Sequence, residues 1–324
     1  MKTFYWLVKR EFWETKGGFF WAPVVTGIVF LVLNGMALIV GEVFGRRAGD
    51  GWKGFRVGGQ GLHSDLAPDQ VAQIGAGIDI MFYVVAGIIL CVTAIVVFFY
   101  ALGSLYDDRR DRSILFWKSL PISDTSTVLS KLVSALLLAP AIAVVVGVLV
   151  ALGMAIIIAI AAAFHGVGLW SLLMASHPIK VVVNLILLIP LYALWALPTV
   201  GWLMLCSAWA RSKPFLWAIV LPVGAGIIVS WFNLLDVPGL SSHWFWQSVV
   251  LRLFGGLMPG SWLMLGEPSS LAGLDHHDPA ALVDGMNLAF HYSTLANPTL
   301  WIGVIAGVAM IAGAIWFRRW RDDS

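Results

Sequence analysis

Residues 132–163, LVSALLLAPAIAVVVGVLVALGMAIIIAIAAA, form a run of 32 residues without Asp, Glu, Lys, Arg or His. A helix needs about 20 mostly apolar residues to cross the hydrocarbon core of a bilayer. A charged side chain at the centre of such a helix costs about 2.5–3.5 kcal/mol on insertion scales. This stretch is therefore long and apolar enough to cross a membrane.

Uncharged windows of this kind recur along the chain. Of the 324 residues, 60% are hydrophobic and 12% are charged, which is about half the charged fraction of an ordinary soluble domain. This composition excludes a soluble globule and a disordered chain, and two cysteines are too few for a disulfide scaffold. The sequence predicts an all-α membrane protein, a single domain over 1–324, with six spans at about 20–40, 80–105, 132–163, 181–208, 215–235 and 300–317.

The basic residues predict the orientation. Six spans place both termini on one side, and most of the 20 Lys and Arg residues fall in the segments on that side. The exceptions are Arg46, Arg47, Lys53, Arg56, Lys180 and Arg252. Because cytoplasmic loops collect Lys and Arg, we expect a multi-pass protein of the plasma (inner) membrane with both termini cytoplasmic.

Two segments outside the windows are apolar enough to contact lipid. Residues 1–17 place Phe4, Val8 and Phe12 at helical spacing, which predicts an amphipathic interfacial helix. The outer loop 236–299 contains the apolar stretch Trp244–Leu265, which Arg252 and the Pro259-Gly260 pair interrupt. We expect a re-entrant or interfacial helix pair there rather than a seventh span, since protein can cover irregular backbone at that depth.

The sequence offers little for catalysis. General acids, bases and metal ligands are titratable groups, and the windows contain only Cys91 and Cys206, which we interpret as packing residues. The phosphate-binding pattern GxxxxGK[ST] is absent from the sequence. The outer Asp275–Asp278 segment, DHHD, is a weak metal motif, and we interpret it as a solvated loop. We therefore predict no catalytic, cofactor-binding or metal-binding residue.

A GxxxG pattern lies in the last window, at Gly303 and Gly307. Such small residues let helices approach closely. We expect this contact to form within the subunit rather than between two copies.

The segment 106–131, YDDRRDRSILFWKSLPISDTSTVLSK, is the most informative part of the sequence. A charge cluster opens it, an amphiphilic run follows, Pro121 stops that run, and Ser123 is a good N-cap for the next helix. A loop that only reverses the chain does not need large apolar side chains in the cytosol. The run either lies on the lipid surface or docks into a groove of a partner protein. The candidate partner-coupling residues are Arg109, Arg110, Arg112, Ile114, Leu115, Phe116, Trp117 and Lys118.

These features together resemble the membrane subunit of ABC-2 type ABC transporters. The resemblance covers the whole chain: the helix at Lys2–Lys16, six spans, the loop from Asp111-Arg112-Ser113 to Leu120-Pro121-Ile122-Ser123 closing with Lys131, and the broken segment Trp244–Leu265. It implies that Arg112–Leu120 is a coupling helix. It also implies a separate ATP-binding cassette protein that carries ATP and Mg, a second permease copy or homologue, and a substrate path between the two permeases.

We therefore expect the permease subunit of an ATP-driven exporter of a hydrophobic or amphipathic substrate such as a lipid, peptide or drug, with membrane lipids but no nucleic acid as further partners. The chain by itself is not expected to be an enzyme. The alternatives are a non-transporting scaffold or immunity-type protein that recruits a cytosolic partner, and a channel or membrane enzyme. The lack of titratable residues in the spans counts against the enzyme.

Overall fold

The computed structural model describes residues 2–48, 56–57, 60–61, 68–111, 122–164, 176–235, 241–265 and 287–320. Within these residues the chain is helical apart from one pair of two-residue strands. Six helices are long and apolar enough to cross a membrane: Gly17–Gly41, Gln70–Arg110, Asp124–Ala163, Pro178–Trp209, Pro214–Leu234 and Pro298–Trp320. The prediction of an all-α, multi-pass membrane protein with six spans is confirmed.

The N-terminal part is one helix that changes its winding where it enters the first span. Helix α1 (Lys2–Glu14) leads through the π-helical turn η1 (Gly17–Trp21) into α2 (Ala22–Ala48). A Cβ at Gly18 would lie 2.6 Å from a methyl group of Val96, so glycine lets this turn pack directly on α3. The short antiparallel pair β1 (Arg56–Val57) and β2 (Gln60–Gly61) follows α2.

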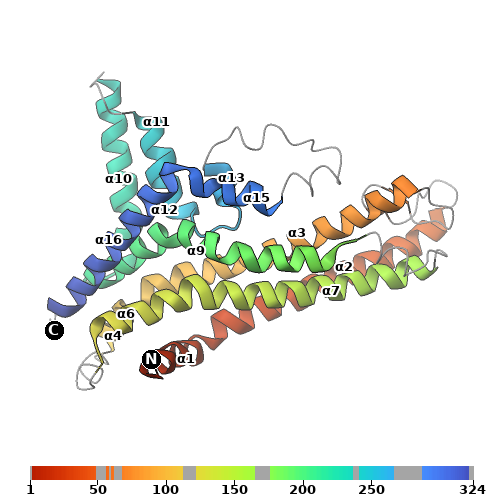
Figure 1. Cartoon of the computed structure of the whole chain (residues 1–324), viewed down its shortest axis with the longest axis horizontal. Helices are drawn as coiled ribbons and strands as arrows, with labels where there is room; N and C mark the ends of the chain where they lie inside the picture. The colour runs from red at the N-terminus through yellow and green to blue at the C-terminus, as the bar shows by residue number, and fades with distance from the viewer. Residues whose placement is uncertain are drawn as a thin grey trace.

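Two helices are longer than a bilayer requires. Helix α3 (Pro68–Gly103) has 36 residues, about 54 Å at 1.5 Å per residue, and the short α4 (Tyr106–Arg110) follows it. Helix α6 (Asp124–Val133) continues through the π-helical turn η3 (Ser134–Leu138) into α7 (Ala139–Phe164). Figure 1 shows α2, α3 and α7 side by side along the long axis of the molecule.

The next two spans form a second group with the last span. Helix α9 (Pro178–Trp209) contains Pro190 and Pro198, and α10 (Pro214–Leu234) begins after Lys213, whose φ of 49° is left-handed. Figure 1 shows α10 at a steep angle to the long helices. Helix α16 (Pro298–Trp320) packs along α9.

The segment before α16 is a broken helical hairpin. It comprises α11 (Ser242–Phe245), the π-helical turn η4 (Trp246–Leu251), α12 (Arg252–Gly255) and α13 (Ser261–Leu265). The chain reverses at residues 256–260, where Gly260 has a φ of 74°, so the expected break at Pro259-Gly260 is confirmed. Helix α15 (Leu288–Tyr292) and the 3₁₀ turn η6 (Ser293–Ala296) lead into α16.

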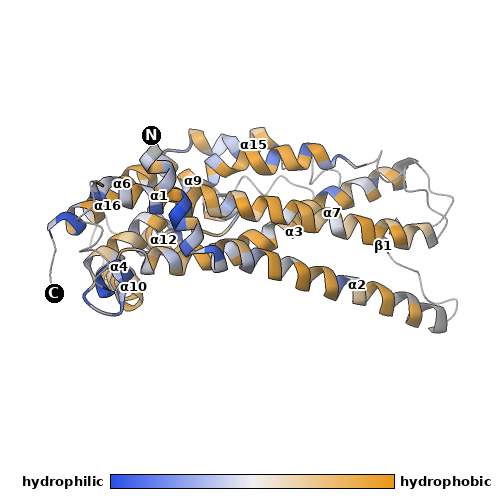
Figure 2. Ribbon diagram, turned by 90° about the horizontal axis from the view of Figure 1, so that it is seen from below, coloured by the Kyte–Doolittle hydropathy of each residue, from blue (hydrophilic) through white to orange (hydrophobic). Residues whose placement is uncertain are grey.

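The core consists of two clusters of buried apolar side chains. One surrounds Trp195 and joins α3, α9 and α16, whereas the other surrounds Phe82 and joins α3 and α7. Figure 2 shows that the long helices are hydrophobic for most of their length and that hydrophilic residues concentrate near α4 and the C-terminus. Helix α6 contacts both α1 and α16, and both ends of the described chain lie at one end of the molecule (Figure 1).

Candidate functional site

The two flanks of the predicted coupling loop are well placed by the structure. Helix α4 ends at Arg110, and Ser123 caps α6 by accepting a hydrogen bond from the backbone N–H of Ser126, as the sequence predicts. The loop itself lies outside the described residues, and with it Arg112, Ile114, Leu115, Phe116, Trp117 and Lys118. Residues 124–131, which the sequence assigned to the loop, form the first turns of a helix continuous with α7.

A buried carboxylate on α1 is the first part of a polar network beside these flanks. Glu11 is 1% exposed. Its carboxylate accepts hydrogen bonds from the Tyr100 hydroxyl at 2.9 Å and from the Lys131 ammonium at 3.3 Å. Arg10 adds a contact at 2.7 Å from its own helix. A buried charge needs such partners to offset the loss of its hydration.

Asp108 extends the network from α4 to the last helix. One of its carboxylate oxygens lies 3.7 Å from the Lys131 ammonium, and the other lies 3.0 Å from the guanidinium of Arg318. Arg318, itself 4% exposed, also donates to Asp124 at 3.1 Å. We call these six residues the buried ion network: Glu11, Tyr100, Asp108, Asp124, Lys131 and Arg318.

The buried ion network ties both flanks of the loop to both ends of the chain. Asp108 precedes the loop, Asp124 and Lys131 follow it, and their partners lie on α1 and α16. Removing one partner of a buried pair costs about 3–5 kcal/mol because the other charge stays uncompensated. A displacement of the loop flanks is therefore resisted by α1 and α16 together.

Arg109 connects α4 to neighbouring backbone next to the buried ion network. Its guanidinium donates to the backbone carbonyls of Leu105, Ser207 and Ala210. The Ser207 hydroxyl in turn accepts from the backbone N–H groups of Leu105 and Tyr106 at 3.0 and 2.9 Å. Arg109 thus fixes α4 to the end of α9.

Arg110, the next residue along the chain, is exposed. Among the described candidate residues, Arg110 is the one whose side chain faces solvent.

Next to the buried ion network lies a polar cavity of about 380 Å³. Its walls are the end of α16 and the start of α6 with the two residues before it. The lining residues are Ile122, Ser123, Asp124, Thr125, Thr127, Ile315, Arg318 and Arg319. Glu14 lies outside the spans on α1, and desolvation raises the pKa of its carboxyl although Arg10 is 3.2 Å away.

A second buried cation lies in the broken hairpin. The guanidinium of Arg252 is 4.3 Å from the ring centre of Trp195 and donates to the backbone carbonyls of Thr299 and Leu300. Its own carbonyl accepts from Thr199 at 3.0 Å. Gly303 leaves room for this side chain, since a Cβ there would overlap the guanidinium. Arg252 therefore joins the hairpin to α9 and α16, a cation–π and hydrogen-bonded arrangement typical of buried arginine.

Other polar groups in the spans are used for local structure. Asn34 and Thr93 donate to the carbonyls four residues earlier in their own helices. Asp79 is 3% exposed and accepts from the backbone N–H of His177, the N-cap position of α9. Asp79 lies inside α3, eleven residues after the first residue of this helix. The uncharged window that predicted this span begins one residue later, at residue 80.

Cys91 and Cys206 are both free. Within the described residues no group of three His, Cys, Asp or Glu side chains is placed to hold a metal ion. The segment Asp275–Asp278 lies outside those residues, and its interpretation stays a prediction.

Burial of Glu11 and Lys131 was not foreseen. The expected apolar face of α1 was Phe4, Val8 and Phe12, whereas the residues that α1 buries are Leu7 and Glu11. Their i, i+4 spacing is the signal that could have located the face.

Comparison of the chain with protein-family models, curated proteins and solved structures found no match.

Proposed function

We propose that this chain is the membrane subunit of an ABC-2 type ATP-driven transporter, most simply an exporter. It acts with a separate ATP-binding protein and a second permease. The observation that carries the proposal is the buried ion network, which links the described residues on both sides of segment 112–121 to α1 and α16. A loop anchored in this way is suited to pass a partner's motion into the spans.

The proposed orientation follows from this role. The loop faces the cytoplasm with both termini, α1 lies on the inner leaflet of the plasma membrane, and the hairpin of α11–α13 is re-entrant from the outer side. The exposed Trp6 and Trp13 on α1 support an interfacial position, since tryptophan favours the membrane–water boundary.

The apolar and the basic residues of the loop are expected to contribute differently to binding of the ATP-binding protein. Moving a two-state permease from 1:99 to 99:1 requires about 5.5 kcal/mol of differential binding. An exposed ion pair contributes about 0–1 kcal/mol, whereas burying a large apolar side chain contributes about 1.5–3 kcal/mol. Phe116 and Trp117 are thus the expected anchors. Arg110 and Arg112 steer the encounter, with a dependence on salt.

The test reconstitutes the chain with a co-expressed ATP-binding cassette protein and measures complex retention and ATP hydrolysis. Phe116→Ala with Trp117→Ala should leave insertion intact but abolish retention and the change in hydrolysis. Trp231→Ala with Phe232→Ala is the matched control, because it removes an exposed aromatic pair at the far end of α10. Arg110→Ala should weaken binding at low salt and have little effect at high salt.

The outcomes separate the transporter from its rival. A non-transporting scaffold would retain the partner through Phe116 and Trp117 but leave its ATP turnover unchanged. Full coupling in the double aromatic variant would overturn the anchor assignment and return this run to the lipid surface.

A further inference from the structure

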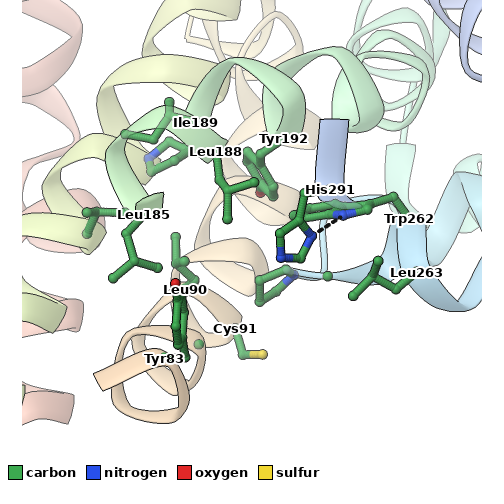
Figure 3. Close-up of a pocket in the computed structure, with 15 residues that line it drawn as sticks. Tyr83, Leu90, Cys91, Leu185, Leu188, Ile189, Tyr192, Trp262, Leu263 and His291 are labelled. Carbon is green, nitrogen blue, oxygen red and sulfur yellow. Dashed lines mark hydrogen bonds between the residues drawn. The ribbon is translucent and has the colours of Figure 1, made fainter. Parts of the chain in front are cut away.

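A cavity of about 290 Å³ lies between the spans and the broken hairpin. Helices α3, α7 and α9 form its walls, and the turn before α13, α13 itself and α15 close one side (Figure 3). Its volume is just below the about 300–1,000 Å³ that small-molecule sites occupy. It is remote in the fold from the loop flanks and from the buried ion network.

Most of the cavity wall is apolar. Leu90, Val144, Leu185 and Leu188 belong to it, and no Asp, Glu, Lys or Arg side chain lines it among the described residues. Apolar walls without atoms against them forfeit their dispersion contacts, and such cavities bind apolar molecules rather than water. The wall chemistry thus selects an uncharged apolar ligand.

One edge of the cavity carries a hydrogen-bond donor that has no acceptor among the described residues. His291 is 5% exposed, and its Nδ1 accepts from the indole N–H of Trp262 at 3.2 Å. Nδ1 is therefore unprotonated, and the proton of the neutral ring lies on Nε2. Figure 3 shows this second nitrogen turned away from Trp262, toward the side of the cavity where Leu188 and Tyr83 lie. Within the described chain Nε2 has no acceptor.

Tyr83 supplies a second donor on the opposite wall. Its hydroxyl oxygen accepts from the side-chain amide of Asn184 at 3.0 Å, which leaves its own proton for another acceptor. The hydroxyl of Tyr192, by contrast, is already used, since it donates to the carbonyl of Leu257 at 2.9 Å. Desolvation also lowers the pKa of His291, so the ring is neutral at physiological pH.

We propose that this cavity binds an uncharged apolar chain with a small group of hydrogen-bond acceptors, such as a fatty-acyl ester, whose oxygens receive the His291 Nε2–H and the Tyr83 O–H. The apolar wall holds the hydrocarbon and the two donors hold the ester group. A carboxylate is disfavoured because no cation balances it in the cavity. The inference stands apart from the proposed transport function, since it requires neither the ATP-binding protein nor the loop.

Gly87 provides a direct way to fill the site. It lines the cavity, and a Cβ built there meets nothing within 4 Å. Gly87→Leu should therefore extend a side chain into the ligand space from a Cβ that meets no protein atom. Gly224→Leu is the matched control, since Gly224 lies in a span outside the cavity and its Cβ would also meet open space.

Cys91 on the cavity wall reports occupancy. In a Cys206→Ala background, the alkylation rate of Cys91 by N-ethylmaleimide is measured on the detergent-purified full chain with and without methyl decanoate. The ester should slow alkylation at least about 5-fold in the parent and in Gly224→Leu, because a site largely filled by ligand hides the thiol. The ratio of the rates with and without ester should be close to one in Gly87→Leu.

The donor assignment has its own variants. His291→Asn keeps an acceptor for Trp262 and replaces the imidazole Nε2–H by the amide N–H of a shorter side chain, so no donor remains at the position of Nε2. Tyr83→Phe removes the second donor, the tyrosine hydroxyl. Each should raise the half-protecting concentration of methyl decanoate by about 2- to 10-fold, the value of one hydrogen bond, and should leave protection by decane unchanged. Equal protection by decane and methyl decanoate in the parent, or full ester protection in Gly87→Leu, would overturn the proposal.

Native mass spectrometry of the chain extracted from membranes identifies the source of the ligand. A phospholipid that stays bound to the parent and to Gly224→Leu, but not to Gly87→Leu, makes the ligand a bilayer lipid. Protection by methyl decanoate without a retained phospholipid makes it a free amphiphile. If the chain retains no phospholipid and methyl decanoate gives no protection, the site is refuted.

Discussion

Glu11 and Lys131 are 120 positions apart in the sequence, yet each is the other's partner in a region where both are almost fully buried. Their side chains are 1% and 4% exposed. An ion pair at this burial contributes little net stability compared with an apolar pair, but breaking it is costly. Its effect is to fix how α1 meets α6.

Glu11→Gln should lower the free energy of unfolding by about 3 kcal/mol, the low end of the cost of breaking a buried pair. The low end applies because Asp108 remains 3.7 Å from the Lys131 ammonium. Thermal or denaturant unfolding of the purified chain in detergent measures the change.

Glu14→Gln is the control on the same helix. Its carboxylate is 52% exposed and pairs with Arg10, and an exposed pair contributes about 0–1 kcal/mol. Equal losses in the two variants would show that Glu11 is not buried as the structure has it.

His291 should make stability dependent on pH. Burial lowers its folded-state pKa below the ordinary value of 6.5, so the unfolded chain binds the proton more readily. Stability is then full above about pH 6.5, falls as the pH drops toward the lowered folded-state pKa, and changes no further below it. Each unit of pKa depression corresponds to about 1.4 kcal/mol.

The measurement is the difference in unfolding free energy between the parent and His291→Asn from pH 7.5 to 4.5. This difference removes the contribution of carboxylates such as Glu14. The other ionisable groups facing the cavity, Tyr83, Cys91 and Tyr192, are neutral over this range. A difference that does not change with pH would contradict the prediction.

At the scale of helices, the contact between α9 and α16 depends on glycine backbone. A Cβ at Gly307 would lie 2.9 Å from the backbone nitrogen of Pro198, and one at Gly201 would lie 2.8 Å from the carbonyl oxygen of Gly307. The pattern at Gly303 and Gly307 thus packs within the subunit, as the sequence indicated.

Gly307→Ala should destabilise the chain by about 1–3 kcal/mol, because the obstructing atoms are backbone and overpacking of this kind forces helices apart. Gly313→Ala on the same helix is the control. Its Cβ would meet a terminal methyl of Leu205 at 3.1 Å, which can rotate away. The comparison uses unfolding in detergent, and a loss at Gly313 as large as that at Gly307 would contradict the packing argument.

The helices were predictable where a local pattern defines them. Uncharged windows gave the six spans, Ser123 gave the start of α6, and Pro259-Gly260 gave the break in the hairpin. The long-range pairs were not predictable, because Glu11 meets Lys131 only after α1 folds back on α6. Asp79 shows the same limit: a charge ends an uncharged window, but in the fold it accepts from His177 and α3 continues past it.

At the scale of the molecule, an even number of spans and the contacts of α1, α6 and α16 place the two ends of the described chain together. The opposite end carries β1, as Figure 2 shows. The end with the chain termini also carries most of the Lys and Arg residues. Because cytoplasmic segments of membrane proteins collect Lys and Arg, we expect the basic end to face the cytoplasm.

Single cysteines introduced at Lys118, Arg211, Arg56 and His277 of a Cys91→Ala/Cys206→Ala chain test this orientation. An impermeant thiol reagent applied to intact cells should label positions 56 and 277 and should label 118 and 211 only after the membrane is opened. Arg211 is exposed and follows α9 at the corner that Arg109 holds, so it reports the side on which the coupling loop lies. Labelling of position 118 from outside would show that the orientation of the chain in the membrane is opposite to the proposed one. It would place the buried ion network away from ATP and so remove the basis for coupling to an ATP-binding partner.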